Sequence, residues 1–509
     1  MHKEIQAQNT PECQEPIQLE LISGKIPTWL NGAMYRIGPG TFNIKQENGL
    51  TFTIRHAFDG LPMVHRFQLN GDQNSVTYNS RHTAKSLEKE IQSDTRGLVF
   101  FGHVINLSFW YWFKDSLVRF YKLVLFPSSK NPDGASVGVT VTPNYPLPLG
   151  INKEKSLVTK TDANILQKIH ADTLMPEKLF SYKDYDPHLN GIFSAAHHQF
   201  DPKTGEIFNF SLDLFPPKLT VFKISKEGHQ TILANLKDFK TSYIHSFYLT
   251  ENYIILPQSP LVYQDSLNIL LSGTALSALT WTDQQSVFHV IHRNGQGLVA
   301  SITAPPFFTF HVANAYEQDH LLILDACCFE NADVLYQLGN FGSPNLLRDP
   351  AASQDHFRGI RYPPKQQVEF GNLLRHKLDL NHSSWVSTEC LAKNIEFPRF
   401  DQQRVGKDYA SVYGCERVKE RIGLIKVDIK KKKTISFETS GQCSEPIFVP
   451  GPLEEEGVLL TLLNDQTCFL LVLDAGDLKE LARFKIGEFN AVTFHGSFVD
   501  YEFQSINVN

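Results

Sequence analysis

The feature that most constrains the fold is a pattern of strand, turn and strand that recurs along the chain, with a histidine near the start of each copy. Three full copies and a partial one occur, in IFSAAHHQFDPKTGEIFNF, TSYIHSFYLTENYIILPQ, FFTFHVANAYEQDHLLILD and NAVTFHGSFVD. Repeated antiparallel units are typical of a β-propeller, in which the first strand of each blade lines a central axis. Helical periodicity is rare outside 104–126 and 265–280, so the sequence predicts an all-β propeller. No Pro-, Gly- or Ser-rich linker divides the chain, and we expect residues 1–509 to form a single domain.

The repeated pattern selects four of the 19 histidines, namely His197, His245, His311 and His495. Their wide separation excludes a local zinc finger, whereas equivalent positions on four blades would meet at the axis. Imidazoles gathered there would repel one another as cations but could share a metal ion when neutral, and imidazole suits zinc, copper, nickel and iron. Fe(II) is favoured because four ligands leave two neighbouring open positions that could take O2. The alternative is that these are core or strand histidines bonded to the backbone.

Composition excludes some functions and leaves others open. The formal net charge of −6 gives no attraction to nucleic acid. The 37 phenylalanines indicate either a β-rich core or a wide apolar cavity for a long lipophilic ligand. The seven cysteines form no CxxC pair, and the polar, acidic N-terminus has no apolar signal core, so we expect an intracellular, cytoplasmic protein.

One segment, residues 104–126, is rich in aromatic and basic side chains and includes Phe109, Trp110, Trp112 and Phe113. Such a mixture suits the boundary between lipid headgroups and acyl chains, although a buried helix is the alternative. No stretch of 18 residues lacks charge, so no membrane-spanning helix is expected. We expect this segment to dip into one leaflet of a membrane or lipid droplet.

Motifs along nearly the whole chain resemble those of the carotenoid cleavage oxygenases, the family that also includes the retinal pigment isomerohydrolase. Beside the four histidine segments they are GKIPTWLNGAMYRIGPGTF (24–42), HAFDGLPMVHRF (56–67), NIEFPRF (394–400) and SEPIFVP (444–450). The stretches VGVTVTPNYP and LVTKTDANILQKI look most like the fungal branch.

The resemblance implies a seven-bladed propeller with a dome of loops and helices over Fe(II), which His197, His245, His311 and His495 would hold. His198 stands where the family usually has a proline. It further implies that three carboxylates orient three of these histidines through the second ring nitrogen. They are Glu396, Glu445 and Asp162, the last at a position that is usually glutamate.

Four residues are candidates for the substrate cavity, namely Phe58, Phe307, Phe310 and Lys160. Phe58 lies in HAFDG (56–60), which we interpret as family scaffold because no nucleophile stands near its His and Asp. RIGPG (36–40) lacks the GxGxxG spacing and a following helix, so we expect a turn there and not a phosphate-binding loop.

The function implied is cleavage of a conjugated C=C bond of a carotenoid or apocarotenoid by Fe(II) and O2, giving aldehyde products. An apolar polyene would leave the membrane at the aromatic segment and reach the metal through a Phe-lined tunnel. Stilbene cleavage is the nearest alternative, with Lys160 as a candidate phenol contact. Isomerohydrolase chemistry is another, and a non-catalytic propeller that only binds proteins is a third.

Overall fold

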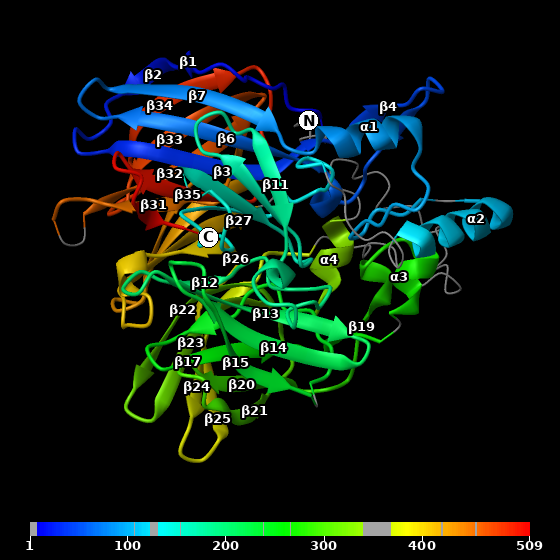
Figure 1. The fold of residues 1–509 in the computed structure, drawn as a ribbon. Coiled ribbons are helices and arrows are strands. Elements are labelled where there is room, and N and C mark those ends of the chain that lie inside the picture. The colour runs from blue at the N-terminus through cyan, green and yellow to red at the C-terminus, as the bar shows by residue number, and fades with distance from the viewer. Residues whose placement is uncertain are drawn as a thin grey trace.

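The computed structural model describes residues 8–105, 107–122, 131–152, 154–237, 239–264, 266–338, 368–418, 421–453 and 456–508. Almost all the regular structure is antiparallel sheet, and four of the sheets have four strands each (Figure 1). The first contains β8 (Thr140–Pro143), β9 (Ser156–Lys160), β10 (Leu166–His170) and β11 (Pro176–Phe180). The second contains β12 (Gln199–Asp201), β13 (Glu206–Leu214), β14 (Pro217–Ile224) and β15 (Gln230–Leu236). The third contains β16 (Tyr248–Leu249), β17 (Tyr253–Gln258), β20 (Ser286–His292) and β21 (Gly297–Ala304). The fourth contains β22 (Phe308–Gln318), β23 (Leu321–Phe329), β24 (Asn372–Asp379) and β25 (Ser384–Ala392).

Two larger sheets complete the main β structure. The first joins both ends of the chain, in the order β1 (Ile17–Gln18), β7 (Ser75–His82), β6 (Leu61–Asn70), β3 (Asn31–Thr41), β35 (His495–Asp500) and β36 (Ser505–Asn507). The second has ten strands, which are β2 (Glu20–Gly24), β26 (Ile395–Arg399), β27 (Ser411–Val418), β28 (Arg421–Asp428), β29 (Lys433–Phe437), β30 (Gln442–Cys443), β31 (Ile447–Pro450), β32 (Gly457–Asp465), β33 (Thr467–Asp474) and β34 (Glu480–Gly487). Within it β26–β29 and β31–β34 each pair in sequence, and β30 joins the two sets.

Successive sheets pack face to face, because their strands carry apolar side chains on both faces. On β13, Phe208 and Phe210 belong to a core shared with β17, whereas the preceding Ile207 belongs to a core shared with β9 and β10. On β23, Leu324 packs toward β17, whereas Cys327 packs toward β27 and β28. These sheets are therefore covered by a neighbouring sheet on each face.

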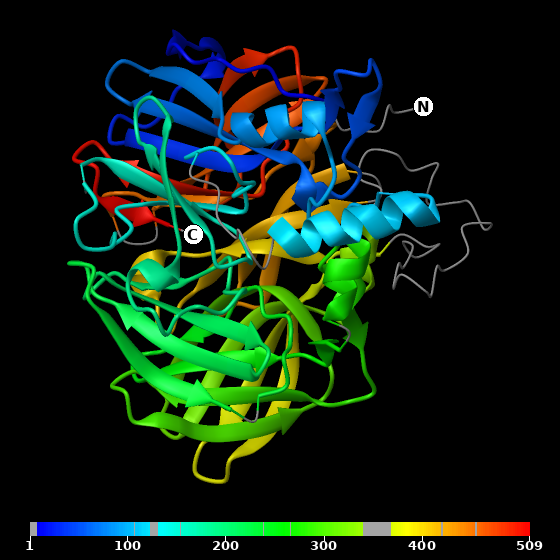
Figure 2. The same cartoon turned by 45° about the vertical axis from the view of Figure 1, so that its right-hand side comes forward.

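The helices gather at one edge of the β structure (Figures 1 and 2). They are α1 (Lys85–Ser93), α2 (Phe109–Phe120), α3 (Leu267–Ser272) and α4 (Asp333–Gln337), and the two-stranded sheets β4–β5 (Asn43–Lys45, Thr51–Thr53) and β18–β19 (Leu261–Tyr263, Leu279–Trp281) accompany them. The sequence predicted helical structure in 104–126 and 265–280 but did not single out α1 or α4. No helix among the described residues is long and apolar enough to cross a bilayer.

The turn expected at RIGPG is wrong, because residues 36–40 lie inside the long strand β3. The glycines there serve close packing. A Cβ on Gly38 would stand 2.5 Å from the Val492 carbonyl oxygen, and one on Gly40 would stand 2.5 Å from the Cβ of Met63. Only glycine therefore fits at these two positions of the strand. Because glycine is also common in turns, its presence alone does not distinguish the two structures.

Candidate metal centre

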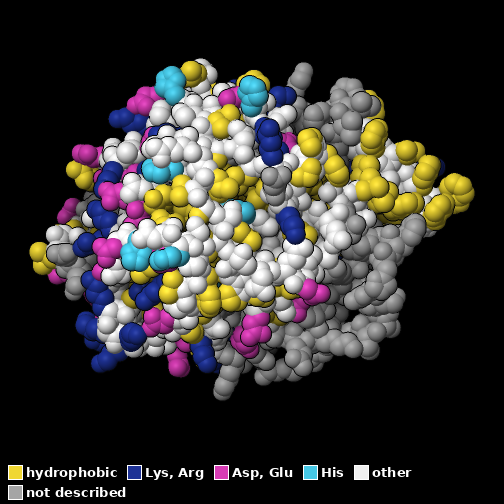
Figure 3. All heavy atoms as spheres, turned by 90° about the horizontal axis from the view of Figure 1, so that it is seen from below, with side chains coloured by type: hydrophobic (Ala, Val, Ile, Leu, Met, Phe, Trp, Pro, Cys, Tyr) yellow, Lys and Arg dark blue, Asp and Glu magenta, His cyan; other side chains and the backbone are white. Residues whose placement is uncertain are grey.

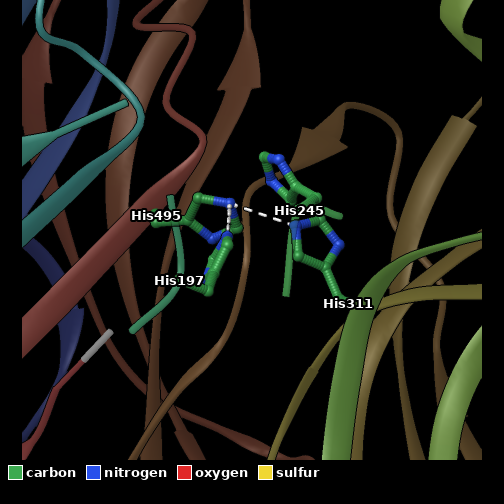
Figure 4. Close-up of side chains that lie close together, drawn as sticks. All are labelled: His197, His245, His311 and His495. Carbon is green, nitrogen blue, oxygen red and sulfur yellow. Dashed lines mark hydrogen bonds between the residues drawn. The ribbon is translucent and has the colours of Figure 1, made fainter. Parts of the chain in front are cut away.

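The four histidines selected by the repeated pattern meet inside the β structure, although they come from four different sheets (Figure 4). His197 and His245 lie just before β12 and β16, His311 lies near the start of β22, and His495 is the first residue of β35. One nitrogen from each ring lies within 4.8 Å of the other three. All four residues are buried.

The surroundings of the cluster favour the neutral imidazole at two of its histidines. Burial and the neighbouring imidazoles lower the pKa of His197 well below its usual range, and burial lowers the pKa of His495 to about 3. The Nε2 atom of His495 lies 3.1 Å from Nε2 of His197 and 3.2 Å from Nε2 of His311. Neutral imidazole nitrogen is the form that binds a metal ion.

A carboxylate accepts a hydrogen bond from the other ring nitrogen of three of these histidines. The Nδ1 atom of His245 lies 2.9 Å from Asp162 Oδ1, and the shorter aspartate does reach its histidine. Likewise, His311 Nδ1 lies 2.5 Å from Glu396 Oε2 and His495 Nδ1 lies 2.9 Å from Glu445 Oε1. A proton on Nδ1 leaves the lone pair of Nε2 directed at the centre of the cluster.

This arrangement fits a bound cation. The Nε2 lone pairs of His311 and His495 face each other at 3.2 Å, with no proton left between them once both Nδ1 atoms donate to carboxylates. Such a contact is repulsive unless a positive ion lies among the nitrogens. Four buried imidazoles are a donor set suited to iron, zinc, copper or nickel.

The surroundings of the cluster differ from one side to the other. Phe58 lies parallel to the His245 ring, with 6.3 Å between centroids, and Phe310 lies 5.5 Å from the same ring. The second side carries a small cavity of about 70 Å³, which His197, His311, Arg399 and Glu445 help to line. Aromatic rings therefore border the cluster beside His245, and the cavity borders it beside His197 and His311.

The other two candidates for the substrate cavity lie elsewhere. Phe307 packs against Phe288 and His376 in the core between two sheets, with ring centroids 5.5 and 4.8 Å apart. Lys160 is buried beneath the loop that carries His197. Its Nζ donates to the Ala196 carbonyl oxygen at 2.8 Å and to His198 Nδ1 at 2.5 Å.

The aromatic segment forms α2, in which one ion pair faces the protein while most of the aromatic side chains face outward. Asp115 and Arg119 are buried and paired with each other, and Arg119 also donates to the Leu270 carbonyl oxygen. By contrast, Trp110 is 71% exposed and Phe113 is 47% exposed. Figure 3 shows hydrophobic side chains gathering on the projection at the right, the side on which α2 lies in Figure 1.

Two further residues of this segment were named as membrane contacts. Phe109 is 59% exposed, whereas Trp112 is half-buried because its indole nitrogen donates to the Leu271 carbonyl oxygen of α3 at 2.6 Å. Residues 106 and 123–126 of the predicted segment lie outside the described residues.

Sequence reasoning missed several residues that contact the cluster or its carboxylates, and three of them have polar side chains. The hydroxyl of Tyr243 donates to Asp162 Oδ2 at 2.8 Å. Arg36 and Arg399 lie on either side of Glu445, with nitrogen–oxygen distances of 3.9 and 3.7 Å. Tyr243 stands two positions before His245, which was the available signal, whereas nothing in the local sequence indicated the arginines.

Fold and cluster together define a mostly β protein with a four-histidine metal site. The family model described as RPE65, retinal pigment epithelial membrane protein, matches residues 6–500, and the chain therefore belongs to this family of carotenoid cleavage oxygenases. The resemblance recognised in the motifs is thus confirmed, and so is the expectation of a dioxygenase of the carotenoid-cleaving class.

Curated relatives match over almost the whole chain. The mitochondrial carotenoid-cleaving dioxygenase of Mustela putorius furo is 28% identical over 94% of this chain and 93% of its own length. The fungal torulene dioxygenase of Fusarium fujikuroi is 26% identical over 95% of this chain and 91% of its own length. Among solved structures, a mutant of the Synechocystis apocarotenoid oxygenase superposes with a TM-score of 0.74 at 22% identity, covering 98% of this chain and 97% of that one.

Proposed function

We propose that the protein is an Fe(II)-dependent dioxygenase that cleaves one conjugated C=C bond of a carotenoid or apocarotenoid. The alkene and O2 are converted to two aldehydes, and each takes one oxygen atom of O2. The observation that carries this proposal is the buried cluster of four histidines with Phe58 and Phe310 on one side. Relatives named for carotenoid and torulene cleavage support the substrate class.

The fold we propose for this activity is a single domain, a closed seven-bladed propeller. The blades would be the four separate four-stranded sheets, the sets β26–β29 and β31–β34, and the sheet in which β3 and β6 pair with β35 and β7. In that last blade an N-terminal strand pairs with the C-terminal one, which would close the ring. The helices and the β4–β5 hairpin would belong to the dome.

The chain's residues supply position and environment to the reaction. His197, His245, His311 and His495 would hold Fe(II), which when bound supplies the redox chemistry that activates O2. Asp162, Glu396 and Glu445 fix the tautomer and orientation of three imidazoles through hydrogen bonds of 2.5 to 2.9 Å. Rings such as Phe58 and Phe310 would position the polyene and exclude water, and no side-chain acid or base is required for the addition of oxygen.

The aromatic face of α2 supports contact with a membrane surface or a lipid droplet, from which a lipophilic polyene would enter. A helix with its charged pair turned inward and its aromatic rings turned outward has the distribution expected in an apolar surrounding. We propose that the protein is intracellular and binds such a surface peripherally.

Stilbene cleavage is not favoured by the geometry at Lys160. Its ammonium group is engaged by Ala196 and His198 and does not line the cavity that His197 and His311 border. A phenol contact from this lysine would have to break both hydrogen bonds in a buried place.

The test is to load the purified protein with Fe(II) and incubate it with β-carotene, an apocarotenal and resveratrol. We expect aldehyde products from at least one carotenoid substrate and none from the His311→Ala variant. Cleavage of resveratrol alone would contradict the substrate class, and iron-loaded protein that cleaves none of the three would contradict the activity.

A further inference from the structure

Glu445, the carboxylate bound to His495, is flanked by two buried arginines. Arg36 comes from β3 and is fully buried, and Arg399 comes from the end of β26 and is 5% exposed. The Arg36 Nη1 atom lies 3.9 Å from Glu445 Oε2, and the Arg399 Nη1 atom lies 3.7 Å from Glu445 Oε1. Two cations from different sheets thus face a single anion.

The same arginines bind the residues on both sides of His495. Arg36 donates from Nε and Nη2 to the Thr493 hydroxyl, at 3.2 and 2.9 Å, and from Nη1 to the Glu445 carbonyl oxygen at 2.6 Å. Arg399 donates to the Gly496 carbonyl oxygen at 3.3 Å and also to Asn507.

Packing at Gly496 tightens this arrangement further. The Gly496 amide donates to Glu445 Oε2 at 3.0 Å, and a Cβ at Gly496 would stand 2.7 Å from Cδ of Arg36. The segment 493–496 is therefore fixed at each end, and the His495 ring has little freedom to move.

The three carboxylates consequently have different electrostatic surroundings. Asp162 accepts a hydrogen bond from the neutral Tyr243 hydroxyl, and Glu396 accepts one from the Phe397 amide at 2.7 Å. Among the described residues, Glu396 Oε1 has no hydrogen-bond partner. Glu445 shares its charge with two guanidinium groups, so it polarises the Nδ1–H bond of its histidine less than Glu396 does. His495 is then the poorest electron donor of the three carboxylate-bound imidazoles.

We propose that Arg36 and Arg399 are positioning residues of the metal centre. They hold Glu445 and His495 in place, and by neutralising Glu445 they weaken His495 as a donor, which makes the four-histidine site electronically uneven. This inference rests on the proposed metal-bound state and adds two residues that act on the metal only through Glu445 and His495.

A purely structural role is the competing explanation, and the chain offers a matched control for it. Arg375 on β24 makes hydrogen bonds of 2.8 and 2.7 Å to the two oxygens of the fully buried Asp325 on β23. Neither residue belongs to the cluster or to its carboxylates. Removing Arg375 therefore disturbs a buried ion pair without touching Glu445 or His495.

The experiment titrates metal-free full-length protein with Co(II), whose visible absorption reports both affinity and ligand field. The variants are Arg399→Gln, Arg399→Lys and Arg375→Gln, with Thr493→Val as a milder change that removes only the hydroxyl that Arg36 binds. We expect Arg399→Gln to weaken Co(II) binding on the order of 10- to 100-fold, because the loss of positioning outweighs the stronger donation from His495, and to shift the absorption band. Arg399→Lys should recover part of both effects, and Thr493→Val should give a smaller change in the same direction.

The control decides between the two roles. Arg375→Gln should lower the thermal midpoint of the metal-free protein but leave the Co(II) affinity and spectrum unchanged. The proposal is overturned if Arg399→Gln and Thr493→Val match the wild type in both readouts, or if Arg375→Gln alters them as much. A wild type that binds no Co(II) overturns this proposal and the metal site together. A wild type that binds Co(II) through its histidines but cleaves no carotenoid with Fe(II) overturns the proposed activity alone.

Discussion

The metal centre and helix α2 both depart from the usual distribution of side chains between interior and surface. The centre buries many charged and titratable groups, whereas α2 exposes large aromatic ones. At the centre, four histidines, three carboxylates and two arginines are buried together. At α2, Trp110 and Phe113 are exposed, whereas Asp115 and Arg119 are buried. Both arrangements would be unfavourable in an isolated chain in water, since buried charge and exposed aromatic surface each cost free energy.

The difference between the two regions indicates which partner each one lacks. The centre satisfies its outer nitrogens with carboxylates but leaves its inner lone pairs facing one another, which a cation would resolve. Helix α2 buries its Asp115–Arg119 pair and bonds Arg119 to α3, but it leaves the rings of Trp110 and Phe113 exposed, which an apolar surface would cover. We propose that a bound cation stabilises the first arrangement and an apolar surface the second.

The largest expected effect is at the centre. His311→Ala removes one ligand and leaves the Glu396 carboxylate buried without its imidazole. We expect metal affinity to fall by well over about 100-fold, more than the loss of an outer carboxylate costs, and cleavage to disappear. Metal analysis after dialysis measures this. His376→Ala is the control, because His376 is equally buried but packs against Phe307 outside the cluster.

The next effect is on the inner face of α2. Arg119→Ala leaves Asp115 charged and buried without its cation, so we expect a loss of about 3–5 kcal/mol in the free energy of unfolding. Chemical denaturation of the metal-loaded protein measures it. The control Arg96→Ala removes an exposed partner of Asp94 and should not change the denaturation midpoint. Equal midpoints for Arg119→Ala and wild type would show that the buried pair does not anchor the helix.

A smaller effect is expected from the carboxylates. Glu396→Gln keeps an acceptor for His311 but removes the charge, and we expect metal affinity to fall about 10-fold or more. The exposed Glu389, changed to Gln, is the control. An unchanged affinity in Glu396→Gln would mean that this carboxylate contributes nothing to holding the metal.

The smallest effect concerns the outer face of α2. Replacing Trp110 and Phe113 together with Ser removes two exposed rings, each worth about 1.5–3 kcal/mol when fully buried in an apolar phase. We expect binding to neutral lipid vesicles to fall by at least about 10-fold while the thermal midpoint stays the same. Tyr501→Ser, which removes an exposed ring on another part of the surface, should change neither quantity. Undiminished vesicle binding in the double variant would exclude this face as the contact.

The sequence predicted those site residues that stand in a recognisable local sequence pattern. Each histidine of the cluster lies just before a strand or near its start, so the repeated pattern of strand and turn is enough to locate all four. The resemblance located Asp162, Glu396 and Glu445, which lie within 3 Å of their histidines. At α2 the mixture of aromatic and charged residues indicated a helix, and the structure adds which side chains face outward.

Contacts between distant strands could not be predicted in this way. Arg36 stands in RIGPG, where the glycines suggested a turn, and its partner Thr493 is 457 residues away. Lys160 illustrates the second difficulty, since the side of a strand on which a lysine points depends on register. Here register directs it beneath the His197 loop, away from the cavity. Phe307 likewise belongs to a core between sheets, although it stands only three positions before Phe310.

The central claim is that the four histidines hold one metal ion, and the most direct test is the metal content of the protein. After purification and reconstitution with Fe(II), elemental analysis should find close to one iron per chain in the wild type and almost none in His245→Ala. Wild-type protein that keeps no metal, or a His245→Ala variant that keeps as much iron as the wild type, would contradict the account.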